Sequence, residues 1–255
     1  MPASERRKRL SFRAILPSIV TILSLSAGLT AIKLSLDGRF EHAVVAIILA
    51  AVFDGIDGSL ARLLKTASRF GAELDSLSDV IAFGVAPAMI LYVWGLNQLG
   101  GIGWIVTLLY AVCMALRLAR FNSMLDDDEE PRKRYGFLTG FPAPMAAYVA
   151  LTPMMIDFEF TGVFSENLWL VALTTAFAAM GMVSKMPTYS LKQLFIRKDH
   201  MMYLLISVGM LVAMITTYQW KPVIVFIAGY MFFLPFSIRR FYLLSKKDKE
   251  KTPAA

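Results

Sequence analysis

The sequence predicts an all-α membrane protein: a polytopic bundle of about eight transmembrane helices with both termini in the cytoplasm. Hydrophobic residues make up 57% of the 255 residues, and the mean hydropathy is +0.59. A membrane-spanning helix needs about 20 predominantly apolar residues, so a chain of this length has room for several. The uneven distribution of Lys and Arg between the apolar stretches supports the same topology.

Eight apolar stretches are long enough to be spans, with boundaries uncertain by a few residues. They lie at residues 15–34, 40–64, 72–96, 103–121, 138–157, 168–184, 201–218 and 223–241. The chain is thereby divided into a basic cytoplasmic segment (1–14), a transmembrane domain (15–241) and a basic cytoplasmic tail (242–255).

The positions of the basic residues indicate on which side of the membrane each connecting segment lies. Five precede the first span, three lie at residues 62–69, five at residues 117–134, four at residues 185–198 and six from Arg239 onward. Only Lys33, Arg39 and Lys221 of the 26 Lys and Arg residues fall on the other side. Cytoplasmic loops of membrane proteins carry such an excess, so both ends are expected in the cytoplasm.

The net charge of +7 therefore reflects topology and contact with anionic lipid headgroups of the bilayer. It does not indicate a nucleic-acid partner. The run of acidic residues at 126–130 is expected to be a solvated cytoplasmic loop, because consecutive side chains point in different directions.

Four carboxylates lie at helical spacing at the cytoplasmic ends of the second and third spans. Asp54 and Asp57 share one helix face, and Asp75 and Asp79 share another. Each Asp at the centre of a spanning helix costs about 2.5–3.5 kcal/mol, so together they oppose burial by about 10 kcal/mol if nothing compensates them. Oxygen-only ligands suit hard divalent cations, so the cluster predicts a site for Mg²⁺ or Mn²⁺.

The residues beside the carboxylates favour a large phosphate-containing ligand. Gly58, Ala61 and Gly71 remove side-chain bulk at helical spacing, although small residues alone more often mean close helix packing. Arg62 adds a cation at the edge of the same stripe, and metals with an arginine suit phosphate.

The pattern D-x-x-D-G-x-x-A-R-x8-G-x3-D-x3-D, from Asp54 to Asp79, resembles the signature of the CDP-alcohol phosphatidyltransferase family without a gap or substitution. Flanking segments, such as L-D-S-L-S-D-V-I-A-F-G-V-A-P from Leu74 and F-L-T-G-F-P-A-P from Phe137, are similar to its membrane-integral phosphatidylserine synthases. The family often has Pro-Asn near the start of its first span, where this chain has Pro17 and Ser18.

The resemblance implies an enzyme that transfers a phosphatidyl group from CDP-diacylglycerol to L-serine and releases CMP. It implies a homodimer and two divalent ions held by Asp54, Asp57 and Asp75, with Asp79 contributing as ligand and as the general base for the serine hydroxyl. It also implies that the CDP part is accommodated by Gly58, Ala61, Arg62 and Gly71.

The α-carboxylate of serine needs a cation that the signature does not already use. The candidates on the cytoplasmic side are Arg117, Arg120, Lys185 and Lys192, of which the arginines share one face of the fourth span. Snorkelling to headgroups and ordinary positive-inside charge are the competing explanations for these residues.

Two other functions fit parts of the pattern. An enzyme of the same family could use glycerol 3-phosphate or inositol as its alcohol. A divalent-cation or proton-coupled transporter could also place carboxylates in a membrane, but transport sites usually lie near the midplane between repeated halves. Asp57 is expected only about 10 Å below the cytoplasmic end of its span, and the sequence has no evident internal repeat.

Overall fold

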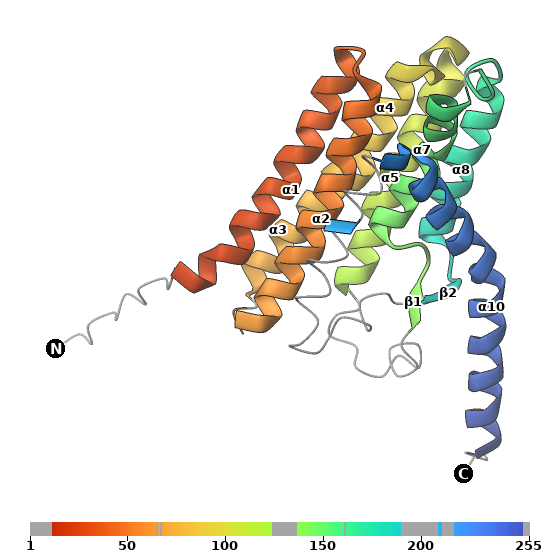
Figure 1. The fold of residues 1–255 in the computed structure, drawn as a ribbon. Helices are drawn as coiled ribbons and strands as arrows, with labels where there is room; N and C mark the ends of the chain where they lie inside the picture. Colours follow the sequence, from red (N-terminus) through yellow and green to blue (C-terminus); the bar gives the residue numbers. More distant parts are fainter. Residues whose placement is uncertain are drawn as a thin grey trace.

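The computed structural model describes residues 12–64, 66, 68–123, 137–160, 162–189, 209–210 and 217–251. Most of these residues are helical, as the sequence predicts. Five helices are long and apolar enough to cross a membrane: Ile15–Leu36, Phe40–Leu64, Arg69–Trp94, Gly101–Ser123 and Lys221–Phe241. Figure 1 shows long helices running side by side along most of the molecule, which is the arrangement of an integral membrane bundle.

The first two helices, α1 (Phe12–Leu36) and α2 (Phe40–Leu64), form an antiparallel hairpin. Gly38 adopts a φ of +74° in the tight turn between them, a conformation that glycine takes without steric cost. Along the shared face, the buried Ser24 hydroxyl donates a hydrogen bond of 2.9 Å to the Ala50 carbonyl. The hairpin therefore places the end of α2 beside the start of α1.

The third span is interrupted by a π-helical turn. It comprises α3 (Arg69–Asp79), the π-helical turn η1 (Val80–Val85) and α4 (Ala86–Trp94). The Ser68 side chain caps the start of α3 by accepting a hydrogen bond of 3.0 Å from the Gly71 amide. Within the π turn, the Phe83 carbonyl accepts a hydrogen bond of 3.1 Å from the buried Tyr110 hydroxyl.

The remaining helices are α5 (Gly101–Ser123), α7 (Ala143–Glu159), α8 (Leu168–Val183) and α10 (Lys221–Lys251), and the short 3₁₀ turn η2 (Leu96–Leu99) precedes α5. Helix α7 lies inside the bundle, where it contacts α8, α10, α4 and η1. Its buried Ala, Met and Val side chains form much of the common core.

Two short strands are an addition to the predicted all-helical fold. Strands β1 (Phe137–Thr139) and β2 (Pro187–Tyr189) pair antiparallel, with Leu138 opposite Thr188. The predicted start of the fifth span at residue 138 is therefore wrong, and α7 begins only at Ala143. The helix cannot extend backwards because Gly140 has a φ of +74° and packs against backbone carbonyls of residues 181–184.

The other predicted boundaries differ less. The predicted span 40–64 coincides with α2, and the predicted span 168–184 ends one residue later than α8. Helix α10 continues to Lys251, so ten residues of the expected tail are helical. The predicted span 201–218 lies outside the described residues, apart from residues 209–210 and 217–218.

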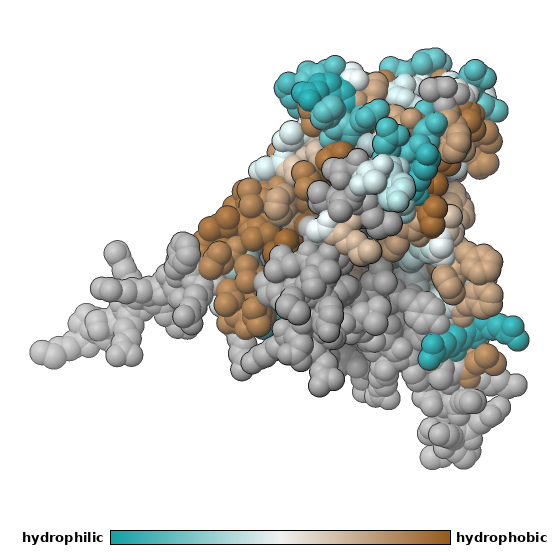
Figure 2. All heavy atoms as spheres, in the orientation of Figure 1, coloured by the Kyte–Doolittle hydropathy of each residue, from teal (hydrophilic) through white to brown (hydrophobic). Residues whose placement is uncertain are grey.

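The surface of the described helices is suited to a lipid environment. Large apolar side chains of α1, α5 and α10 are exposed, among them Ile22, Ile105 and Phe232. Figure 2 shows such residues over the flank formed by α1, whereas hydrophilic residues gather at the upper end of this view. An apolar flank with a polar end is what a bundle embedded in a bilayer requires.

Candidate metal centre

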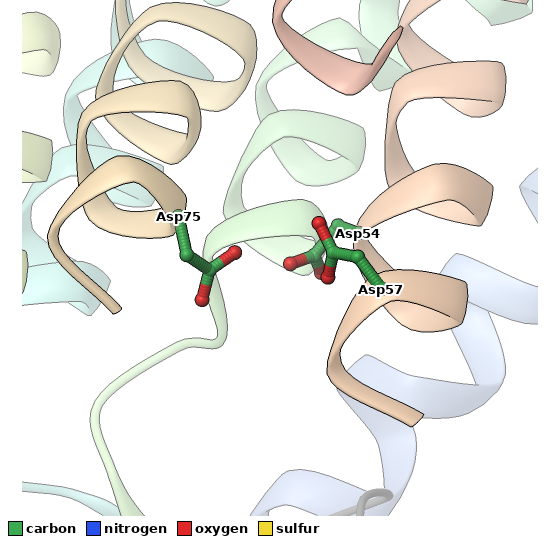
Figure 3. A group of neighbouring side chains, drawn as sticks. All are labelled: Asp54, Asp57 and Asp75. Carbon is green, nitrogen blue, oxygen red and sulfur yellow. The ribbon is translucent and has the colours of Figure 1, made fainter. Parts of the chain in front are cut away.

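Three of the four signature carboxylates meet between α2 and α3. Asp54, Asp57 and Asp75 each offer a carboxylate oxygen, and these three oxygens all lie within 4.8 Å of one another. Figure 3 shows Asp54 and Asp57 on α2 pointing toward Asp75 on α3. Asp57 is buried, with 4% of its surface exposed, while Asp54 and Asp75 are partly buried.

The short connection between the two helices explains how the acids come together. The Thr66 amide donates to the Ala61 carbonyl, and Ser68 caps the next helix, so the chain reverses within a few residues. Asp54 and Asp57 lie three positions apart near the end of α2, and Asp75 lies in the middle of α3. Because α2 and α3 run antiparallel and are joined by this short loop, their acidic faces lie at the same depth along the bundle.

Helix α1 adds a residue that sequence reasoning missed. The Thr21 hydroxyl donates a hydrogen bond of 2.6 Å to Asp57 Oδ2. The Thr21 carbonyl accepts a hydrogen bond of 3.3 Å from the Ser78 hydroxyl of α3. Thr21, Asp57 and Ser78 are all buried, so three helices meet at one polar contact.

A pocket of about 150 Å³ opens beside the acids, between α1, α2 and α3. Asp57 and Asp75 contribute to its wall, together with the predicted small residues Gly58, Ala61 and Gly71. A side chain added at Gly58 would meet no atom within 4 Å, so glycine keeps this space open. The pocket also includes residues that sequence reasoning did not select: Pro17, Ser18, Thr21, Thr66, Ser68 and Ala72.

Arg62 lies outside this lining. Its side chain is exposed, and its Nε donates a hydrogen bond of 2.9 Å to the Gly58 carbonyl one turn earlier. The contact holds the guanidinium group along the last turn of α2, next to a residue of the pocket wall.

Asp79 is the last residue of α3 and lies outside the group of three acids. It is close enough to Arg117 of α5 for the two charges to interact, and Asp54 also acts on Arg117. Asp79 and Asp54 thus both lie within electrostatic range of a cation on a neighbouring helix. Tyr148 of α7 lies within electrostatic range of Asp54, and spacing along the chain gave no signal for it.

The two arginines of α5 have different partners. Arg117 is half-buried, and its Nε donates a hydrogen bond of 2.6 Å to the Phe141 carbonyl just before α7. The Arg120 guanidinium donates to the Val183 carbonyl at 2.8 Å and lies within 3.5 Å of the Met182 and Ser184 carbonyls. Arg120 thus caps the end of α8, where helical carbonyls lack partners within the helix.

The two candidate lysines are placed differently again. Lys185 is exposed in the segment between α8 and β2. Lys192 lies outside the described residues.

The donor set of the acidic group fits a divalent cation. Its three residues supply only carboxylate oxygens, which hard cations such as Mg²⁺ and Mn²⁺ prefer over nitrogen or sulfur ligands. Asp57 experiences the charges of both Asp54 and Asp75, and a bound cation would relieve this repulsion. Thr21 supplies the hydrogen-bonded outer contact that metal-binding side chains commonly have.

A profile of the CDP-alcohol phosphatidyltransferases matches residues 14–180. The chain therefore belongs to the CDP-alcohol phosphatidyltransferase family, which confirms the resemblance seen in the signature. The matched region includes all but the first two residues of α1 and continues through α5, so it contains all four carboxylates.

Curated relatives are similar over most of the chain. The protein named CDP-diacylglycerol–serine O-phosphatidyltransferase in Mycobacterium bovis is 37% identical over 225 residues, which is 88% of this chain and 78% of the relative. The protein of the same name in Mycobacterium leprae is 34% identical over 238 residues, or 93% and 79% of the two chains. Archaetidylserine synthase of Methanothermobacter thermautotrophicus is 36% identical over 163 residues, covering 62% and 64%.

Proposed function

We propose that this membrane enzyme transfers a phosphatidyl group from CDP-diacylglycerol to L-serine, giving phosphatidylserine and CMP. The observation that carries the chemistry is the acidic group of Asp54, Asp57 and Asp75 beside a pocket walled by small residues. The choice of serine rests on the relatives, two of which are named for serine transfer and cover nearly nine-tenths or more of this chain.

The CDP part of the donor lies in the pocket between α1, α2 and α3. Gly58, Ala61 and Gly71 give room for a nucleotide against the helix backbone, and Arg62 at the end of α2 supplies positive charge for phosphate. The acyl chains of the donor remain in the bilayer beside the apolar flank of α1. Each part of the substrate thereby stays in the medium that suits it.

Asp54, Asp57 and Asp75 are the residues that would hold divalent cations, and we propose Mg²⁺ or Mn²⁺, with two ions as the family resemblance implies. When bound, such cations polarise diphosphate oxygens and neutralise the negative charge of the departing CMP. Asp57 is also oriented by Thr21, so its carboxylate is held before any substrate enters.

Asp79 acts as the general base. The serine hydroxyl oxygen forms a bond to the phosphatidyl phosphorus while the bond from that phosphorus to the CMP oxygen breaks, and the hydroxyl proton passes to the Asp79 carboxylate. The position of Asp79 supports this role, because it lies one helical turn after Asp75 on α3 without belonging to the acidic group. CMP leaves with the electrons of the broken bond.

Arg117 is the cation that we assign to the serine carboxylate. It lies within electrostatic range of Asp79, the proposed base, so a serine bound to Arg117 would have its hydroxyl near that carboxylate. The Arg120 guanidinium has three carbonyls at the end of α8 within 3.5 Å, whereas Arg117 contacts one carbonyl through Nε, so Arg120 is the structural residue in this proposal. The spacing of the two arginines predicts a shared helix face, and it is their different hydrogen-bond partners that suggest different roles.

The proposed topology has eight spans, cytoplasmic termini and an active site that opens to the cytoplasm. Helices α8 and α10 run in the same direction (Figure 1), which supports an additional crossing between them, where the seventh span is predicted. The excess of basic residues at the end that carries the acids supports the orientation. We also propose a homodimer from the family resemblance, which cross-linking in membranes tests.

The test is CMP release by the purified enzyme in detergent with CDP-diacylglycerol and a panel of alcohols. We expect release with L-serine and little with glycerol 3-phosphate or inositol, and we expect the lipid product to carry the label of radioactive serine. Chelation should abolish turnover, and Mg²⁺ or Mn²⁺ should restore it. Preferred use of another alcohol would contradict the assignment of serine, and full turnover of metal-free enzyme in excess EDTA would contradict the metal centre.

A further inference from the structure

A single side chain of α1 connects the first helix to both acidic helices. Thr21 is 4% exposed, and its hydroxyl lies 2.6 Å from Asp57 Oδ2 on α2. Its carbonyl accepts the Ser78 hydroxyl of α3, one position before Asp79. The signature from Asp54 to Asp79 lies on α2, α3 and the loop between them, so this contact comes from outside it.

The Thr21 hydroxyl has one proton and two acceptors nearby. The Pro17 carbonyl lies 3.1 Å away and Asp57 Oδ2 lies 2.6 Å away. A charged acceptor at the shorter distance forms the stronger hydrogen bond, so the proton points to the carboxylate. Thr21 is then a buried donor to Asp57.

We propose that Thr21 is a positioning residue that fixes the rotation of the Asp57 carboxylate and thereby sets the affinity of the acidic group for its divalent cation. A carboxylate held at one oxygen cannot turn about its Cβ–Cγ bond, so its remaining ligand direction is defined before the cation arrives. Outer hydrogen-bond partners of metal ligands act in this way. The inference rests on the proposed metal centre.

The chain offers a matched control on the same helix. Ser24 lies three positions after Thr21, is also buried, and donates a hydrogen bond of 2.9 Å across the same helix pair to the Ala50 carbonyl. Ser24→Ala thus removes one buried hydroxyl and one contact between α1 and α2 without touching an acid. Any general effect of loosening this pair should appear in both variants.

The experiment measures Mn²⁺ binding to purified wild type, Thr21→Val, Thr21→Ser and Ser24→Ala by electron paramagnetic resonance of free Mn²⁺, without substrate. Thr21→Val keeps the shape of the side chain and loses the donor, so we expect about 10- to 100-fold weaker binding. Thr21→Ser should restore most of the affinity, and Ser24→Ala should bind as wild type. In turnover assays, Thr21→Val should need more Mn²⁺ but recover much of its kcat at saturation.

Thermal unfolding and gel filtration establish that each variant is folded. Wild-type Mn²⁺ affinity in folded Thr21→Val would overturn the positioning role and leave the metal centre intact. Equal loss in Ser24→Ala, or no recovery in Thr21→Ser, would also overturn it, because the effect would then come from helix packing. Absence of Mn²⁺ binding in the wild type would overturn the metal centre itself and this inference with it.

Discussion

Asp75 and Asp79 lie four positions apart on α3, yet only Asp75 shares the acidic group with Asp54 and Asp57. Asp79 lies one helical turn further along α3, outside that group and within electrostatic range of Arg117. At the scale of single residues, this separation divides four chemically identical carboxylates into a group suited to a cation and one suited to a proton.

Asp79→Asn and Asp75→Asn should therefore fail in different ways. We expect Asp79→Asn to retain binding of Mn²⁺ and CDP-diacylglycerol and to lose turnover by about 10²-fold or more, because the proton acceptor is gone. Asp75→Asn should lose affinity for both ligands. Equilibrium binding of Mn²⁺ and of a donor analogue, measured beside CMP release, distinguishes the two; wild-type turnover in Asp79→Asn would remove it as the base.

Arg117→Ala and Arg120→Ala should also differ. Loss of a charge-assisted contact costs about 1.5–3 kcal/mol, so Arg117→Ala should raise the apparent KM for serine by roughly tenfold to a few hundredfold with little change for CDP-diacylglycerol. Arg120→Ala should lower the melting temperature, because the α8 carbonyls lose their donor, and should leave the KM for serine unchanged.

Arg117→Lys provides a control, since it retains the charge and loses the planar group that contacts the Phe141 carbonyl. If Arg120→Ala raised the KM for serine and Arg117→Ala did not, the assignment of the two arginines would be reversed.

Sequence spacing found the acids but not their neighbours. Asp54, Asp57 and Asp75 could be grouped in advance because positions along one helix fix a face, and a short loop fixes how two helices meet. Thr21 could not be assigned to the site in advance, because it lies 36 positions before Asp57 in the sequence. Which residues of α1 face α2 depends on the rotation of α1 about its axis, and spacing within the signature does not determine that rotation. The same limit applies to Tyr148 and to the different partners of Arg117 and Arg120.

At the scale of secondary-structure elements, α2 contains two glycines, of which only one lines the pocket. Side chains added at Gly55 or Gly58 would meet no atom within 4 Å, and only Gly58 belongs to the pocket wall. Gly28 of α1 differs from both, because an added Cβ would lie 2.7 Å from the Ala82 backbone of the π turn.

Gly58→Ala should weaken CDP-diacylglycerol binding without unfolding the protein. Alanine favours a helix by about 0.5–1 kcal/mol over glycine, so the fold should be retained while the methyl group reduces the pocket. We expect a higher KM for CDP-diacylglycerol in Gly58→Ala and an unchanged one in Gly55→Ala. Equal KM values for CDP-diacylglycerol in the two variants would contradict the assignment of the nucleotide to this pocket.

The helix boundaries show what hydropathy can and cannot predict. The span 40–64 was predicted correctly, since its apolar run is bounded by polar turns. The start of α7 was not, because residues 137–142 are mostly apolar yet form a strand and a turn. The positive φ of Gly140 and the pairing of β1 with β2 depend on contacts made 50 residues away, which a local window does not contain.

For the molecule as a whole, the distribution of Lys and Arg is the argument for orientation. Arg62 lies at the end of α2 that carries the acids, and His42 lies at the other end of α2, near its turn with α1. Arg120 contacts the end of α8, and Arg240 lies in α10 three positions after Ser237, whose hydroxyl contacts the Pro187 carbonyl of β2. Cys113 is the single cysteine of the chain and is buried, so its replacement allows labelling at chosen positions.

We expect a membrane-impermeant thiol reagent added to intact cells to label His42→Cys and not Arg240→Cys, both in a Cys113→Ala background. The positive-inside rule places His42 outside and Arg240 in the cytoplasm. Both side chains are exposed, and permeabilised cells, in which both variants should react, control for reactivity. Labelling of Arg240→Cys alone in intact cells would show that the orientation is the reverse of the one proposed.

The π turn at Val80–Val85 separates the two halves of the third span. In it the Ala86 amide bonds to the Ile81 carbonyl, five positions back, so the turn acts as an insertion of one residue into an α-helix. One residue changes the angular phase of a helix by about 100°. The acidic half can therefore face α2 while the apolar half keeps its own face toward α1 and α5. Deleting one residue here would leave every charge in the chain and still turn the two halves out of phase.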